Sequence, residues 1–208
     1  MECIEAVNED RKQWNILGFV DDNPALAGTS ILDYPVLGPA AIFAQPAYRN
    51  CRVAIGVAND RDIFVRERIR KSLEVASERL PAIIHPSAVV SKRRQIGAGS
   101  VLFSGTFLSG NCTIGTHTLV LQGAVISHDT NIGDWATICA GVATGGGVQI
   151  GNGAFIGLGA RIFPNVRIGR GSRVGLGSVV LRDVGDGETV SGIPARKHEH
   201  RIALKTGT

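Results

Sequence analysis

A six-residue repeat runs without insertion through the second half of the chain. Stepping by six from Ile84 to Val180 meets Ile, Leu or Val at every position except Thr144. Four residues after each of these positions stands a small side chain, with Arg94 as the misfit. Ile-Gly pairs recur at three times that period, at 96/97, 114/115, 132/133, 150/151 and 168/169. Three units therefore make one larger turn of the chain.

An α-helix has no period of six, whereas a prism of short parallel strands does. In such a prism the aliphatic residue and the small residue two positions before it point inward, and the next residues turn a corner. Successive coils stack about 4.8 Å apart, and each buried aliphatic side chain contributes roughly 1.5–3 kcal/mol. The repeat predicts a parallel β-solenoid. Its spacing leaves the handedness open, and the general rule for parallel crossovers is right-handed.

The residues before Ile84 follow another pattern. It predicts a helix from Glu2 to about Asp10, apolar strands over 16–20 and 52–56, and a helix from near Asn59 to about Glu78. After Val180 the six-residue repeat ends. We therefore expect an α/β domain over 1–82, the solenoid over 83–184 and a C-terminal tail over 185–208.

Composition narrows the class of protein. The chain is 44% hydrophobic with 27 glycines, which is unlike a disordered tail, and it lacks the Gly-X-Y period of a collagen. Its net charge of +4 is spread along the chain, so no nucleic-acid footprint is expected. No apolar run approaches the roughly 20 residues of a membrane span, and the amino terminus is acidic. Four scattered cysteines without metal-ligand spacing agree with a cytoplasmic protein.

Stacking at eighteen residues predicts which corner side chains are neighbours. His128 has a glycine on the coil below and another on the coil above, in the column Lys92, Gly110, His128, Gly146, Pro164. Asp129 follows it along the chain. A second corner column ends on two leucines in Gly-Leu-Gly triplets and reads Pro86, Ser104, Gln122, Ala140, Leu158, Leu176. We expect a histidine in a cleared niche, and an exposed apolar strip that serves as a ligand channel, a subunit contact or both.

Simpler or competing interpretations exist for these features. A lone corner histidine is often only a surface residue. Ser127, His128 and Asp129 do not suit a hydrolytic triad, because sequence neighbours cannot generally align as nucleophile, base and orienter. The glycines over 145–147 precede no helix, which disfavours a phosphate loop. The histidines of 198–200 are weak evidence for a metal, so no metal site is predicted.

Three motifs join the repeat: Ile-Ser-His-Asp-Thr-Asn-Ile-Gly over 126–133, Gly-Phe-Val-Asp-Asp over 18–22 and Gly-Ile-Pro-Ala-Arg over 192–196. With the repeat, they resemble bacterial sugar acyltransferases of the left-handed β-helix superfamily, namely the sialic acid O-acetyltransferases and the nucleotide-sugar N-acetyltransferases. The resemblance implies a mainly β fold, with a left-handed parallel β-helix preceded by a small Rossmann-like α/β domain. It also implies a homotrimer with acetyl-CoA in the cleft between neighbouring prisms.

The same resemblance implies roles for individual residues. His128 matches the general base, and Asp129 stands where many relatives have the Glu that orients the imidazole. The implied coenzyme contacts are Thr137, Leu158, Leu176 and Arg196. The implied nucleotide-sugar contacts are Asp21, Asp22 and Gly56. Relatives begin with a strand and a glycine-rich turn, whereas this sequence begins at Met1 inside the following helix, so its α/β domain lacks that strand and turn. Either the start was assigned too late, which the intact helix and Asp-Asp strand end favour, or the chain has lost part of its sugar-nucleotide site.

The expected reaction is direct acetyl transfer from acetyl-CoA to a sugar, most simply the amine of a nucleotide-linked amino sugar, with His128 as the base. Sialic acid-type O-acetylation is an alternative, and so is a non-catalytic nucleotide-sugar-binding or scaffold trimer. A zinc carbonic anhydrase on the same solenoid would need three converging histidines. The spacing of His117 and His128 does not favour that enzyme.

Overall fold

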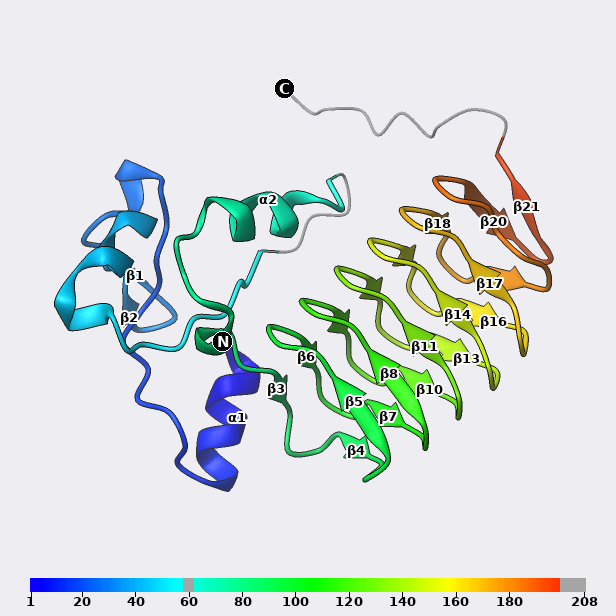
Figure 1. Ribbon diagram of the computed structural model, residues 1–208, viewed down its shortest axis with the longest axis horizontal. Helices are drawn as coiled ribbons and strands as arrows, with labels where there is room; N and C mark the ends of the chain where they lie inside the picture. Colours follow the sequence, from blue (N-terminus) through cyan, green and yellow to red (C-terminus); the bar gives the residue numbers. More distant parts are fainter. Residues whose placement is uncertain (58–61, 199–208) are drawn as a thin grey trace.

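The computed structural model describes residues 1–57 and 62–198, and all structural statements below concern these residues. A small amino-terminal unit lies beside the first coils of a regular stack, and the stack runs on to β20 and β21 at its far end (Figure 1). The chain forms a left-handed parallel β-helix, which confirms the fold class predicted from the repeat and the resemblance. The right-handed rule therefore does not apply to this solenoid.

Short strands make three flat faces, which we name by their first strands. The β4 face has six strands: β4 (Val89–Val90), β7 (Phe107–Leu108), β10 (Val125–Ile126), β13 (Ala143–Thr144), β16 (Arg161–Ile162) and β19 (Val179–Val180). The β5 face has five: β5 (Arg94–Ile96), β8 (Cys112–Ile114), β11 (Asn131–Ile132), β14 (Gln149–Ile150) and β17 (Arg167–Ile168). The β3 face has eight: β3 (Ile83–Ile84), β6 (Val101–Leu102), β9 (Leu119–Val120), β12 (Thr137–Ile138), β15 (Phe155–Ile156), β18 (Arg173–Val174), β20 (Thr189–Gly192) and β21 (Ala195–Lys197).

The strand register confirms the stacking predicted from the sequence. Ile132 pairs in parallel with Ile114 on one side and with Ile150 on the other, so residues eighteen apart in sequence are direct neighbours. The aliphatic residues from Leu102 to Val180 and the small residues from Ser100 to Ser178 are buried inside the prism. Arg94, the misfit in the repeat, is exposed on the first coil. β20 adds one more parallel strand above β18, although the repeat ends before it.

The amino-terminal unit agrees with the sequence in part. α1 spans Glu2–Asp10, as predicted, and packs beside β3. A short hairpin of β1 (Ser30–Ile31) and β2 (Tyr34–Pro35) follows. Four 3-10 helices complete the unit: Pro24–Leu26, Ala40–Ala44, Pro46–Tyr48 and Ser77–Arg79.

The two strands predicted over 16–20 and 52–56 are extended but form no regular sheet. Phe19 makes a single parallel bridge to Val36, and Val53 N–H donates to the carbonyl of Arg79 at 2.8 Å. An apolar run favours an extended backbone, but a strand also requires hydrogen-bonded neighbours. Here the predicted strands lack such partners over most of their length.

The second predicted helix, from near Asn59 to about Glu78, is wrong in length. α2 spans only Val65–Ser72. The chain then becomes extended and buries Val75 and Leu80 in the core. Burial of these two side chains outweighs the local helical preference. Residues 59–61, where the sequence places the start of this helix, lie outside the described residues.

Within the described ranges, no helix has the length and apolar character needed to cross a membrane.

Candidate active site

His128 lies at the corner between β10 and β11, outside the prism, and its side chain is 69% exposed. A Cβ added at Gly146 on the coil above would come 2.5 Å from His128 Cε1. A Cβ at Gly110 on the coil below would meet only Ser91 Oγ, at 3.8 Å. The imidazole therefore rests against bare backbone at Gly146. The niche expected from the column of corner residues is present.

Asp129 holds the imidazole through a hydrogen bond at Nδ1. His128 Nδ1–H donates to Asp129 Oδ2 at 2.7 Å, and Asn111 Nδ2 donates to Asp129 Oδ1 at 3.1 Å. These two hydrogen bonds, that from His128 first, lower the pKa of the Asp129 carboxyl below its ordinary value. An ionised Asp129 is thus the acceptor for Nδ1–H.

Two residues at this corner have a left-handed backbone conformation. Asn111 and Asp129, stacked on successive coils, both have φ of 59°, in the left-handed region. Asn and Asp tolerate this region better than other side chains do. The chain can therefore turn sharply after His128 while Asp129 folds back toward the ring.

This arrangement suits proton transfer. The Nδ1–H bond to a carboxylate fixes the imidazole orientation and leaves Nε2 as the free nitrogen. A neutral imidazole in this tautomer can accept a proton at Nε2 from an approaching nucleophile. Asp129 would stabilise the resulting cation through its negative charge. Ser127 makes no hydrogen bond to the ring among the described residues, so the corner lacks the alignment of a hydrolytic triad.

Leu158 and Leu176 form an apolar ledge on another corner, between the β3 and β4 faces. Their side chains are 50% and 67% exposed. Gly177 N–H donates to the carbonyl of Leu158 at 2.7 Å, which stacks the two Gly-Leu-Gly triplets directly. The ledge offers apolar contact and bare backbone to an elongated ligand.

Thr137 lies apart from this ledge, on the β3 face beneath α2. Arg66 of α2 is buried there, and its Nη2 donates to Thr137 Oγ1 at 3.1 Å and to the carbonyl of Trp135 at 3.0 Å. Burial lowers the pKa of Arg66 to about 10. In this arrangement the Thr137 hydroxyl is already engaged within the chain.

Arg196 lies on β21 at the far end of the β3 face and is exposed. Its Nη1 donates to the carbonyl of Ala195 at 2.9 Å. The neighbouring Lys197 forms an ion pair with Glu188 at 2.5 Å. Of the sequence 198–200 singled out above, residues 199 and 200 lie outside the described residues.

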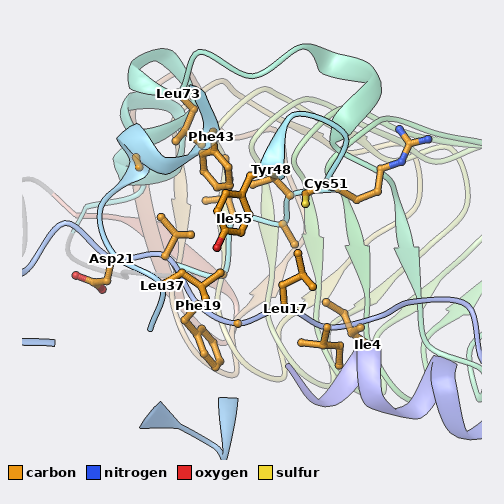
Figure 2. Close-up of a pocket in the computed structure, with 18 of the residues that line it drawn as sticks. Ile4, Leu17, Phe19, Asp21, Leu37, Phe43, Tyr48, Cys51, Ile55 and Leu73 are labelled. Atoms are coloured by element: carbon orange, nitrogen blue, oxygen red, sulfur yellow. The ribbon is translucent and has the colours of Figure 1, made fainter. Parts of the chain in front are cut away.

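The amino-terminal unit contains a cavity of about 750 Å³. Asp21, Asp22 and Gly56 all line it, so the structure brings together the three residues that the resemblance assigns to the nucleotide sugar. Most other side chains around it are apolar or aromatic, and Figure 2 shows Leu17, Phe19, Leu37, Phe43, Tyr48 and Ile55 gathered there. Asp21 lies at the edge with its carboxylate directed away from these apolar side chains.

The two aspartates already have backbone partners. Asp21 Oδ1 accepts from Asn23 N–H at 2.8 Å, and Asp22 Oδ1 accepts from Ala40 N–H at 2.8 Å. These bonds fix the turn that follows the extended segment 16–20. The second oxygen of each carboxylate has no hydrogen-bond partner among the residues that the structure describes.

Phe43 and Tyr48 were not identified from the sequence. They come from the 3-10 helices Ala40–Ala44 and Pro46–Tyr48. Turns this short carry no amphipathic period that a sequence pattern could reveal. Tertiary packing alone directs these rings toward the cavity.

The cavity and the His128 corner are separate within one chain. Among the described residues that line the cavity, only Ile83 belongs to a strand of the solenoid. His128 lies on the corner between the β4 and β5 faces instead. Within the described part of a single chain, the cavity and the His128 corner are therefore two separate features.

Comparison with known proteins places this geometry in context. Residues 2–72 match the family model described as the PglD N-terminal domain. A histidine-to-alanine variant of GDP-perosamine N-acetyltransferase from Caulobacter crescentus, solved with CoA and GDP-perosamine, is 30% identical. The alignment covers 95% of this chain and 91% of that one, with a TM-score of 0.82. A search of curated protein sequences gives no significant match.

Two further structures are similar over nearly the whole chain. The acetyltransferase domain of PglB from Neisseria gonorrhoeae is 27% identical, with 94% and 93% of the two chains covered and a TM-score of 0.82. WeeI from Acinetobacter baumannii is 31% identical, with 95% and 93% covered and a TM-score of 0.80. The likeness therefore extends through both the amino-terminal unit and the solenoid. The chain belongs to the family of hexapeptide-repeat sugar acyltransferases.

Proposed function

We propose that this chain transfers an acetyl group from acetyl-CoA to the amine of a nucleotide-linked amino sugar, with His128 as the general base. The observation that carries the proposal is the exposed imidazole of His128, held at Nδ1 by ionised Asp129 and seated on Gly146. Its support is the similarity, over 95% of the chain, to an N-acetyltransferase solved with CoA and GDP-perosamine.

In this mechanism Nε2 of His128 accepts a proton from the sugar nitrogen as that nitrogen attacks the thioester carbonyl. The C–N bond forms as the C–S bond breaks, and the proton returns to the departing thiolate of CoA. No covalent intermediate on the enzyme is required. Much of the acceleration then comes from holding the two substrates together in the correct orientation.

The acetyl donor is acetyl-CoA, and the ledge of Leu158 and Leu176 is the proposed contact for its apolar portion. Both leucines are exposed in the single chain, and the following glycines, Gly159 and Gly177, leave open space beside them. Arg196 is an exposed cation at the same end of the solenoid and suits the phosphates of the coenzyme. Thr137 is not included, because Arg66 occupies its hydroxyl.

The cavity of the amino-terminal unit is the proposed site for the sugar nucleotide. Asp21 and Asp22 can accept hydrogen bonds from hydroxyl or N–H groups of the ligand, and Gly56 leaves open space beside the backbone. The aromatic and aliphatic lining suits the flat face of a nucleobase. The sugar would then extend out of the cavity toward a histidine.

A homotrimer would join the two parts of the site. On the β4 face, the outward side chains Val89, Phe107 and Val125 are exposed on successive coils. Both the His128 corner and the leucine ledge border this face, one at each edge. If a second copy covers the β4 face, these features lie at the boundary between chains, where substrates from two chains can meet.

The test is acetyl-CoA-dependent release of CoA thiol across a panel of nucleotide-linked amino sugars and of sugars with free hydroxyls. With an amino-sugar acceptor, His128→Ala is expected to lose on the order of 10² to 10⁴ in kcat. Calorimetry should show unchanged CoA affinity. His85→Ala serves as the control, because His85 lies on the first coil and its side chain bonds only to Ser87 among the described residues.

Each outcome has a distinct meaning. Undiminished turnover in His128→Ala would remove His128 from the mechanism. Turnover only with hydroxyl acceptors would identify an O-acetyltransferase, and CoA binding without transfer to any acceptor would favour a non-catalytic binding protein.

A further inference from the structure

One backbone hydrogen bond repeats along the whole solenoid. In all but one of the units, the residue that follows the inward aliphatic position donates its N–H to the carbonyl of the aliphatic residue one coil above. On the β4 face this bond joins Ser109 to Ile126 at 2.9 Å and Gly145 to Ile162 at 2.8 Å. The other two faces show the same bond, for example between Gly133 and Ile150 at 2.8 Å. The series extends from His85 to Gly175.

The series is interrupted at a single unit among the described coils, and that unit immediately precedes His128. Ser127 N–H does not donate to the carbonyl of Thr144. It donates to the side-chain hydroxyl, Thr144 Oγ1, at 3.1 Å. Accordingly, β10 and β13 pair only at Val125 and Ala143, whereas β10 and β7 pair at two positions.

Thr144 is also the single exception among the aliphatic positions of the repeat. It is buried, at 5% exposure, in a row otherwise filled by Ile, Leu and Val. A valine of nearly the same shape would fill this space without a hydroxyl. The exception in sequence and the exception in hydrogen bonding are therefore the same residue.

The carbonyl of Ser127 is also held by a side chain. Cys112, one coil below, donates its thiol to that oxygen at 3.2 Å. Burial raises the pKa of the Cys112 thiol, so the proton needed for this bond is retained. The residue before His128 is thus held from inside the prism by two side chains, one on the coil below and one on the coil above.

We propose that Thr144 is a positioning residue for the reaction: its hydroxyl replaces a backbone carbonyl as the acceptor for Ser127 and so sets the placement of the His128 corner. This inference rests on the proposed role of His128 as the base. Thr144 does not touch a substrate and acts through the backbone of Ser127.

The physical reason is the location of the acceptor. Oγ1 and the carbonyl oxygen of residue 144 occupy different points, so the peptide before His128 has a different position from that in a regular coil. The carbonyl of Thr144 is released from the bond that its equivalents make in other units. Displacements of about 1 Å near a reacting group can cost on the order of 100-fold in rate. A regular coil would hold the imidazole elsewhere relative to Gly146.

The variant Thr144→Val tests the proposal, because valine keeps the shape and removes the acceptor. A backbone N–H away from water is almost always hydrogen-bonded. In the variant, Ser127 N–H should therefore donate to the carbonyl of residue 144, and this change should displace the imidazole. We expect kcat to fall about tenfold or more, with the KM for acetyl-CoA within about twofold and the melting temperature unchanged or raised. Thr144→Ser, which keeps the hydroxyl, should restore most of kcat.

Thr118→Val is the matched control. Thr118 is likewise buried, and its Oγ1 donates to the carbonyl of Gly133 at 2.8 Å, away from the His128 corner. This variant should lower the melting temperature without lowering kcat. It thereby separates loss of a buried hydroxyl in general from loss of the hydroxyl at residue 144.

A crystal structure of Thr144→Val gives a readout that does not depend on activity. The proposal requires Ser127 N–H to lie within about 3.2 Å of the carbonyl of residue 144, with the imidazole moved away from Gly146. An unmoved imidazole, or a kcat within about twofold of wild type, would overturn the proposal. If wild type transfers no acetyl group, the proposed function fails, and the crystal structure still decides the role of Thr144.

Discussion

His128 and Asp129 are consecutive residues whose side chains bond to each other directly, at 2.7 Å from Nδ1 to Oδ2. Sequence neighbours on a strand point to opposite faces and cannot meet in this way. The contact exists because Asp129 has φ of 59° at a solenoid corner, where the chain reverses its side-chain direction. The repeat therefore forms both the buried core and corners at which the side chains of adjacent residues can bond to each other, which an extended strand does not allow.

The first prediction concerns the carboxylate that orients the imidazole. Asp129→Asn removes its negative charge, and we expect kcat to fall about tenfold or more while acetyl-CoA affinity stays unchanged. Asp129→Glu keeps the charge and should retain more activity than Asp129→Asn. Steady-state kinetics with both substrates varied provide the measurement. Equal rates for wild type and Asp129→Asn would contradict the orienting role.

The same carboxylate gives a prediction for stability against pH. The hydrogen bonds from His128 and Asn111 lower the native pKa of Asp129. The group therefore stabilises the fold above its unfolded pKa of about 4. That stabilisation is lost as the pH falls through the native pKa. Melting temperatures of wild type and Asp129→Asn should differ at pH 7 and converge at low pH. A difference that stays constant down to about pH 2 would argue against this linkage.

A second site prediction uses the two glycines that flank His128. Neither Gly146 nor Gly110 has φ in the left-handed region, so alanine fits both backbones. Gly146→Ala would place its Cβ 2.5 Å from His128 Cε1 and should displace the ring, lowering kcat about tenfold or more. Gly110→Ala has room for its methyl group and should stay near wild type. Comparable losses in the two variants would show that the niche does not control the imidazole.

The leucine ledge predicts a change in KM. Leu176→Asp replaces an exposed apolar side chain with a charge, and we expect the KM for acetyl-CoA to rise about tenfold with kcat little changed. Leu32→Asp is the control, because Leu32 is also exposed but lies in the turn between β1 and β2. An unchanged KM in Leu176→Asp would place the coenzyme elsewhere.

The apolar β4 face predicts self-association. Phe107→Asp introduces a charge on this face, on the strand next to its first strand, and light scattering after size-exclusion chromatography should then detect a smaller species than the trimer expected of wild type. Gln149→Asp makes a matched change on the polar β5 face and should leave the trimer intact. A wild-type protein that elutes as a monomer would refute the proposed assembly.

The solenoid could be predicted in detail because its constraints are local and periodic. Every coil repeats one pattern. The position of a residue within the repeat therefore predicts the face on which it lies, its neighbours eighteen positions away and whether it is buried. Ile132, His128 and Leu176 could each be placed by counting. The exposed imidazole between two glycines, and the stacked leucines on another corner, followed from the same arithmetic.

The amino-terminal unit could not be predicted so well, because its structure depends on contacts between segments distant in sequence. The apolar run over 52–56 favoured a strand, yet the structure gives it few backbone partners. The burial of Val75 and Leu80 ended α2 well before the predicted limit. The cavity that contains Phe43 and Tyr48 is formed by irregular turns whose positions no local pattern specifies.

The sequence by itself determined the prism, its corners and the residues exposed on them, because a period of six leaves one way to bury the aliphatic positions. Only the tertiary structure decided which hydrogen bonds hold the His128 corner in place. The contact of Asp129 with His128 depends on the left-handed backbone of Asp129 at the corner. The hydrogen bond from Ser127 to Thr144 depends on the distance between atoms on two neighbouring coils. The sequence marked Thr144 as an exception, but the reason lies in where its hydroxyl comes to rest.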